Sequence, residues 1–258
     1  MILALALLML GVAVLSYPAL SDYVNRRNGS SAIQTLSAAL EQTAPERLAE
    51  ERRRAEQYNA ACSASGEGVP EEYESIMDFG NGVMGYLSIP KIGVTLPIYH
   101  GVSEQVLRKG VGHLPRSALP IGGAGNHAVL SGHTGLPTAE LLTELTELEP
   151  GDRFSVSVLE ETLVYQVDQV KVVLPAEVED LAPVAGEDLC TLVTCTPYGV
   201  NSHRLLVRGV RVPGEAQAEA AAAAVTRPQV PVLLLAAAVA ELGALTAFVV
   251  LLVRRRRG

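Results

Sequence analysis

The sequence predicts a mainly β fold, either a closed barrel or a sandwich, preceded by a helical region and flanked by two membrane segments. Between residues 84 and 213, short β-branched segments alternate with turns rich in Gly, Pro and Asp, which is typical of all-β domains. Long apolar runs lie near both ends of the chain, outside this region. The pattern therefore indicates one outward-facing domain held between two hydrophobic segments.

The first apolar run, residues 1–20, is uncharged and slightly short for a membrane span. A signal peptide is the alternative, but no small-x-small cleavage site follows, which favours an anchor. The second run, residues 230–253, is long enough to cross the hydrocarbon core, and we interpret Glu241 within it as a protonated or helix-facing side chain. Arginines at 254–257 favour a cytoplasmic end. Both termini are then expected inside, with the middle of the chain outside the cell membrane.

Residues 22–83 are expected to form a helical and lid-like region. Good helix formers (Ala, Glu, Arg, Leu and Gln) dominate the composition between positions 31 and 61. Thr43-Ala44-Pro45-Glu46 has the form of a capping box, which predicts a helix from here to about Asn59. The composition of residues 62–70 predicts a flexible loop, and we interpret Cys62 as a free loop thiol.

The β domain, residues 84–213, is predicted to contain several short strands and one helix. Leucines at positions 141, 142, 145 and 148 recur at helical spacing, which predicts a helix over 137–148. An Ala-rich linker, residues 214–229, leads to the second membrane segment. The strands are expected at residues 85–89, 94–99, 127–131, 153–159, 162–174, 191–195 and 205–212.

Charge and cysteine content exclude several classes of function. The net charge of -8 argues against a nucleic-acid partner, which requires a basic face. Three cysteines are too few for a disulfide scaffold, and no Cys-x-x-Cys pair suggests zinc. We expect no metal and no cofactor.

A cysteine ends one of the predicted strands. Side chains alternate along a strand, so Cys195 shares a face with Thr191 and Val193, while Cys190 points the other way. Cys190 is therefore interpreted as a small core or edge residue. Cys195 stands where a side chain can be both rigidly held and reachable, although spacing alone leaves a reactive and a buried cysteine equally open.

A reactive thiol needs a nearby cation or base to form a thiolate. Arg204 begins the strand that returns after a loop of Pro, Gly, Asn and Ser, so it is a candidate for binding an oxyanion, with an ordinary surface arginine as the alternative. Of five histidines, His133 is the candidate base because glycines on both sides leave room for it to face a cleft. Of the other candidates, His127 is expected to be an edge residue and His100 a structural one, and alternation aims His203 away from Arg204. His113 is the remaining histidine.

These candidates occur in motifs that resemble the sortases, a family of cysteine transpeptidases. Residues 191–195 (TLVTC) match the family's Thr-Leu-x-Thr-Cys signature. His133 within SGHTG, and Arg204 nine residues after the cysteine, match the family's His and Arg. The resemblance covers roughly residues 70–212. Four further strings resemble the class C, pilin-polymerising branch: residues 82–86 (GVMGY), 89–92 (IPKI), 96–101 (LPIYHG) and 195–201 (CTPYGVN).

The resemblance implies an eight-stranded sortase β-barrel and a thiol mechanism at a Gram-positive cell surface. The Cys195 thiolate would attack the Thr–Gly bond of an LPXTG-type sorting motif, and His133 would protonate the leaving amine. Arg204 would stabilise the oxyanion. The acceptor in class C enzymes is typically a lysine amine of another pilin subunit, so the implied partners are LPXTG-bearing pilin or surface proteins. The sequence does not define an oligomeric state.

One feature of the class C branch is missing. Class C enzymes commonly carry a lid with an Asp-Pro-aromatic motif, and residues 59–78 contain no such tripeptide. Asp78-Phe79 lacks the proline, so no lid role is assigned to it.

Two other functions were weighed. A cell-wall anchoring sortase would use the same chemistry with a peptidoglycan amine as acceptor. A non-enzymatic surface or pilin substrate protein would also end in an apolar run and arginines. Such a substrate needs an LPXTG-like pentapeptide before that run, and residues 225–231 contain none, which disfavours it.

Overall fold

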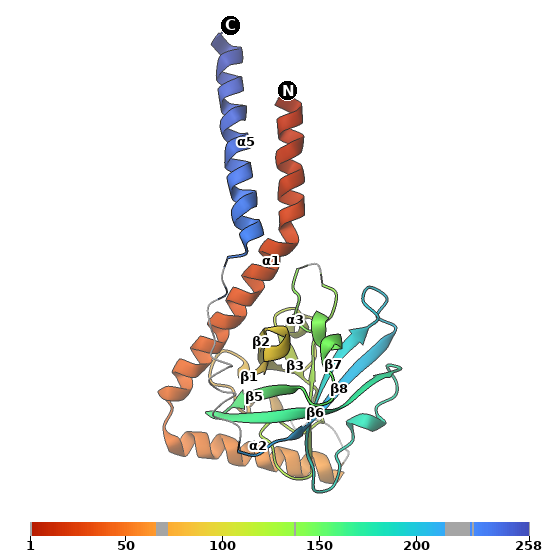
Figure 1. The fold of residues 1–258 in the computed structure, drawn as a ribbon. Coiled ribbons are helices and arrows are strands. Elements are labelled where there is room, and N and C mark those ends of the chain that lie inside the picture. Colours follow the sequence, from red (N-terminus) through yellow and green to blue (C-terminus); the bar gives the residue numbers. More distant parts are fainter. Residues whose placement is uncertain (1, 66–71, 137, 215–227, 229, 258) are drawn as a thin grey trace. The chain divides into compact units, whose positions relative to one another are not determined.

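The computed structural model describes residues 2–65, 72–136, 138–214, 228 and 230–257 (Figure 1). The described chain divides into two units. The first is drawn from residues 1–27, 137–139 and 227–258, and holds the start of one long helix and the C-terminal helix. The second is drawn from residues 28–136 and 140–226, and contains the β domain.

The second unit is built on eight strands. They are β1 Val83–Ile89, β2 Val94–His100, β3 Val111–His113, β4 Asn126–Ser131, β5 Arg153–Val158, β6 Glu161–Val173, β7 Asp188–Thr196 and β8 His203–Arg211. Within the described residues, the α-helices are α1 Ile2–Glu41, α2 Pro45–Ser65, α3 Glu104–Leu107 and α5 Val232–Arg257. Short 3-10 helices are η1 Tyr73–Ser75, η2 Pro90–Ile92, η3 Thr143–Glu147 and η4 Glu179–Leu181.

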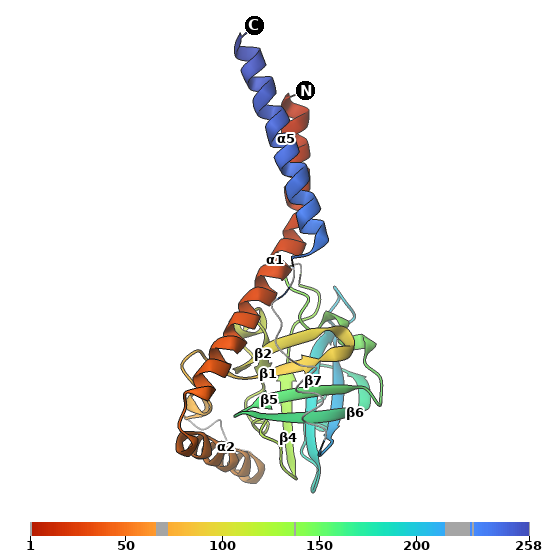
Figure 2. The same ribbon diagram turned by 60° about the vertical axis from the view of Figure 1, so that its left-hand side comes forward.

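The strands close into a barrel in the order β1-β2-β3-β4-β7-β8-β6-β5. This barrel, which Figure 2 draws in a second view, confirms the predicted fold class and decides for a barrel over a sandwich. Inward-facing side chains fill its interior, including the stacked rings of Phe154 and Tyr165, whose centroids lie 5.5 Å apart. Gly209 permits this stack, because a Cβ there would lie 2.7 Å from the Phe154 ring. The interior is thus a packed core, and a binding site must lie on the outside or at a rim.

Strand β3 was not predicted. It has only three residues, too few for an alternation pattern to be seen. It lies beside β2, where a Cβ on Gly112 would come within 2.2 Å of the Gly101 carbonyl oxygen. A glycine is therefore needed for this close approach.

The predicted helix over 137–148 is wrong. Residue 137 lies outside the described residues, Leu141 has a positive φ of 44°, and only η3 is helical. The four leucines at positions 141, 142, 145 and 148 are nevertheless buried. The backbone N–H of Leu142 donates to the carbonyl oxygen of His133, which ties this segment to the residues that follow β4. The leucine spacing reflected burial against the barrel rather than an α-helical face.

Two predictions in the helical region also need correction. The hydroxyl of Thr43 donates to the carbonyl oxygen of Ala39, so it completes the end of α1 instead of capping α2. Cys62 lies on α2, which extends to Ser65, and is not a loop residue. The rest of the expected loop, residues 66–70, lies outside the described residues.

The C-terminal part of α1 packs on the barrel. Leu36 and Leu40 join Val83 and Tyr99 in a buried cluster. The N-terminal part is apolar, and α1 is long and apolar enough to cross a membrane. The described apolar stretch of α5, Leu234–Val250, is shorter, so a second span stays a prediction.

Candidate active site

Cys195 and Arg204 lie opposite each other on neighbouring strands. β7 and β8 are antiparallel, and their register pairs Cys195 with Arg204 directly. Side chains of directly paired residues extend from the same face of a sheet, with Cβ atoms about 4.5–5.5 Å apart. The hairpin therefore places a guanidinium beside the thiol.

His133 reaches the same level from the other side of β7. β4 and β7 are parallel, and their last registered pair is Ser131 with Val193. The pairing continues past the strand end, because the Gly132 N–H donates to the Val193 carbonyl oxygen at 3.0 Å and the Thr194 hydroxyl donates to the Gly132 carbonyl oxygen at 2.8 Å. Two residues beyond the last pair, His133 is level with Cys195. The three predicted site residues thus meet at one end of β4, β7 and β8.

The two cysteines of β7 face opposite sides, as alternation predicted. Cys190 is fully buried, and burial raises the pKa of its thiol well above the ordinary value. A thiol in that state is a poor nucleophile. Cys195 is partly exposed on the other face, and it is a free thiol. Of these two, only Cys195 can meet a substrate.

The other histidines are engaged in structural contacts. Burial lowers the pKa of His113 to about 4 and also lowers the pKa of His100 and of His127. His113 contacts the Tyr73 hydroxyl, and His127 contacts the hydroxyl of Thr191. His100 bonds to the carbonyl oxygen of Ile76, and His203 contacts the hydroxyl of Ser202. These contacts support His133 as the candidate for proton transfer.

The Arg204 guanidinium is held by the backbone. Its Nη1 donates to the carbonyl oxygens of Asn201, at 3.3 Å, and His203, at 3.1 Å. Carbonyl acceptors orient a guanidinium without neutralising its charge. Its remaining N–H groups can therefore serve an oxyanion beside Cys195.

One residue of this site was missed by the sequence analysis. Glu104, at the start of α3, places Oε2 3.1 Å from Nε2 of His133. Its Oε1 accepts a hydrogen bond from Arg108 Nε at 2.8 Å. The pKa of Glu104 is lowered, first by the Arg108 hydrogen bond and then by that of His133. The only sequence signal for Glu104 was that it is an acidic residue in the segment after a predicted strand. A single residue in such a segment has no periodicity that would distinguish it.

We next considered whether side chains of the described residues could bind a metal ion. No group of three or more His, Cys, Asp or Glu side chains that could hold a metal ion occurs in the part of the chain that the structure describes. The expected absence of a metal and a cofactor stays a prediction.

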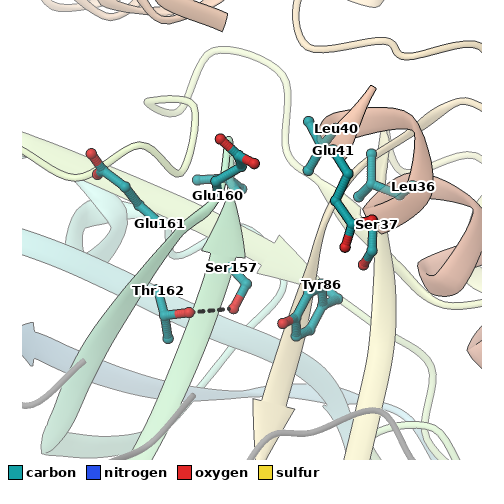
Figure 3. A pocket seen from close by; sticks show the side chains of 10 residues that line it. Leu36, Ser37, Leu40, Glu41, Tyr86, Ser157, Glu160, Glu161 and Thr162 are labelled. Atoms are coloured by element: carbon teal, nitrogen blue, oxygen red, sulfur yellow. Dashed lines mark hydrogen bonds between the residues drawn. The ribbon is translucent and has the colours of Figure 1, made fainter. Parts of the chain in front are cut away.

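A cavity of about 170 Å³ lies elsewhere on the barrel, between α1, β1 and the β5–β6 hairpin (Figure 3). Leu36 and Leu40 line its helix side, Tyr86 lies on β1, and Glu160 and Glu161 project from the hairpin. None of the three predicted site residues lines it. This hollow therefore belongs to the docking of α1 rather than to the candidate chemistry.

Comparisons with known proteins identify similar sequences and folds. Residues 87–212 match the family model described as Sortase domain. The solved structure of sortase C1 from Streptococcus agalactiae is 46% identical with a TM-score of 0.68, covering 71% of this chain and 99% of that one. That of sortase C from Streptococcus pneumoniae, whose title mentions pilin substrate specificity, is 41% identical with a TM-score of 0.66, covering 71% and 97%.

A curated relative is similar over a shorter stretch. Sortase SrtE1 of Streptomyces coelicolor is 32% identical over 163 residues, which are 58% of this chain and 44% of that protein. The chain spans about half the length of the curated relatives that it matches.

Proposed function

The chain belongs to the sortase family, with class C sortases among its structural neighbours, and from this premise we propose that it is a membrane-anchored cysteine transpeptidase. The observation that carries the proposal is the convergence of Cys195, His133 and Arg204 at one end of three adjacent strands. A thiol, an imidazole and a guanidinium together supply a nucleophile, a proton carrier and an oxyanion ligand.

The first half-reaction forms a thioester. The Cys195 thiolate attacks the carbonyl carbon of Thr in an LPXTG-type motif, and the carbonyl electron pair moves onto oxygen. Arg204 donates hydrogen bonds to this oxyanion. When the carbonyl re-forms, the C–N bond breaks and the leaving Gly nitrogen takes a proton from the His133 imidazolium.

The second half-reaction returns the enzyme to its starting state. An acceptor amine attacks the thioester carbon and gives a proton to His133. Collapse of the second tetrahedral intermediate expels the Cys195 thiolate and leaves an amide bond. Because thioesters are activated toward amines, no cofactor or energy source is required.

The acceptor is proposed to be a lysine amine of a pilin subunit. The class C neighbours support this choice, and one of them, sortase C of Streptococcus pneumoniae, is described in terms of its pilin substrate specificity. The second candidate, a peptidoglycan amine, uses identical chemistry at the thioester.

The membrane topology is part of the proposal. Helix α1 anchors the enzyme in the cell membrane, and the catalytic domain works outside the cell. The arginines at 254–257 hold the C-terminal end in the cytoplasm.

The test detects the thioester as an increase in the intact mass of the enzyme. The full chain in detergent micelles is incubated with an LPXTG peptide, and a covalent adduct is expected on wild type and on Cys62→Ala but not on Cys195→Ala. A lysine-bearing pilin peptide should then release the adduct faster than a peptidoglycan stem peptide. An adduct that persists in Cys195→Ala would contradict the assignment of the nucleophile.

A further inference from the structure

Glu104 contacts the candidate proton carrier from outside the barrel strands. Its carboxylate Oε2 lies 3.1 Å from His133 Nε2, within hydrogen-bond distance. The His133 side chain is 22% exposed, whereas that of Glu104 is 58% exposed. The carboxylate therefore approaches one edge of a half-buried ring from the solvent side.

The chain positions this carboxylate through a short connection between β2 and β3. Ser103 caps α3, its hydroxyl oxygen accepting from the Val106 N–H at 3.4 Å, so Glu104 falls in the first turn. Val106 packs against β3, where a Cβ on Gly112 would lie 3.0 Å from its methyl group. Arg108, one turn on, holds the second carboxylate oxygen. Glu104 is thus fixed at both oxygens.

The contact decides which ring nitrogen remains for chemistry. An imidazole has two nitrogens, and a carboxylate at one of them fixes the ring's orientation and favours a proton there. With Nε2 bound to Glu104, only Nδ1 is left to exchange a proton with the reacting groups. Other charged or titratable groups at this end include Arg108, which follows α3, Cys195 on β7, and His203 and Arg204 on β8.

We propose that Glu104 is a positioning residue that holds His133 by Nε2 and directs Nδ1 toward the Cys195 thioester chemistry. This inference rests on the proposed transpeptidase function. The Nε2–H bond to Glu104 persists throughout, while the Nδ1 proton passes to the leaving amine and is replaced from the acceptor amine. The arrangement extends the Cys-His pair to a carboxylate-His-Cys triad. In this triad Glu104 orients the histidine and itself never changes protonation.

The kinetic test separates the charge of Glu104 from its hydrogen bond to His133. Glu104→Gln keeps an acceptor for Nε2 but removes the charge, and Glu104→Ala removes both. On a fluorogenic LPXTG peptide, we expect kcat to fall about two- to fivefold in Glu104→Gln, a size typical of an exposed ion pair, and further in Glu104→Ala, with KM unchanged. The control is Glu147→Gln, which changes an exposed carboxylate of η3 and should keep kcat.

A second measurement does not depend on activity. In the full chain labelled with 15N-histidine, the Nε2–H signal of His133 should be visible in wild type and in Glu104→Gln and lost to solvent exchange in Glu104→Ala. A retained signal in Glu104→Ala, or a loss of kcat in Glu147→Gln equal to that in Glu104→Ala, overturns the proposal. If the wild type fails to cleave the peptide, the proposed function fails, while the histidine signal still decides the role of Glu104.

Discussion

At the scale of single residues, strand geometry separates two cysteines that are only five positions apart. Cys190 points into the barrel and is buried, and Cys195 points outward at the strand end. The same register that turns Cys195 outward pairs it with Arg204. Chemical character here follows from position on the pleat, since both side chains are identical thiols.

Arg204 offers a residue-scale prediction. Removing one donor from an oxyanion site costs about 10²–10³-fold in rate, so Arg204→Ala should lower kcat on an LPXTG peptide by roughly that factor. Arg204→Lys keeps a charge but loses the planar fork, and it should recover only part of the loss. Arg211→Lys, at the other end of β8, is the control and should stay close to wild type. Full activity in Arg204→Lys would show that charge alone is needed.

At the scale of elements, the site depends on three neighbouring strands, of which two are parallel and the third is antiparallel to them. β4 and β7 run parallel, so their C-terminal ends meet, and the antiparallel β8 brings its N-terminal end to the same place. His133 follows β4, Cys195 ends β7 and Arg204 begins β8. The topology thus assembles residues that are up to 71 positions apart in the sequence.

The docking of α1 gives an element-scale prediction. Ile33, Leu36 and Leu40 are buried at helical spacing, which marks one face of α1 as part of the barrel's packing. Leu36→Ala should reduce the free energy of unfolding of the full chain by about 2–4 kcal/mol, because it removes a buried side chain next to an existing cavity. The exposed Gln34→Ala is the matched control. Near-UV circular dichroism of the tyrosines during urea unfolding measures both; equal stabilities would show that α1 does not pack on the barrel in solution.

At the scale of the whole molecule, several buried histidines make the folded state less stable in acid. Burial lowers the pKa of His113 to about 4, and the pKa values of His100 and His127 are lowered for the same reason. An unfolded chain binds protons at these rings below about pH 6.5, whereas the folded chain does not. Stability is therefore full above pH 6.5 and falls as the pH drops toward 4.

The acid sensitivity can be measured directly. His113 alone should remove about 3 kcal/mol of unfolding free energy between pH 7 and pH 4. His113→Gln should be less stable at pH 7, because it disturbs the contacts to Tyr73 and Ala118, but its stability should depend less on pH. The exposed Gln34→Ala, which changes no titratable group, should keep the wild-type slope. An unchanged slope in His113→Gln would mean that this ring is not the acid-sensitive group.

The sequence by itself determined the parts with a local or motif signal. Alternation and turn residues predicted all the longer strands, alternation separated Cys190 from Cys195, and motif resemblance pointed to Cys195, His133 and Arg204. These signals are readable because strand pleat and turn chemistry act over a few residues.

Only the tertiary structure decided what depends on contacts between distant segments. It closed the strands into a barrel, placed the three-residue β3 against β2, and buried the leucines at 141–148 without an α-helix. It also brought Glu104 to His133, across 29 positions of sequence. No local pattern encodes such a contact, because it arises from how β2, β3 and β4 pack and not from the residues that flank either partner.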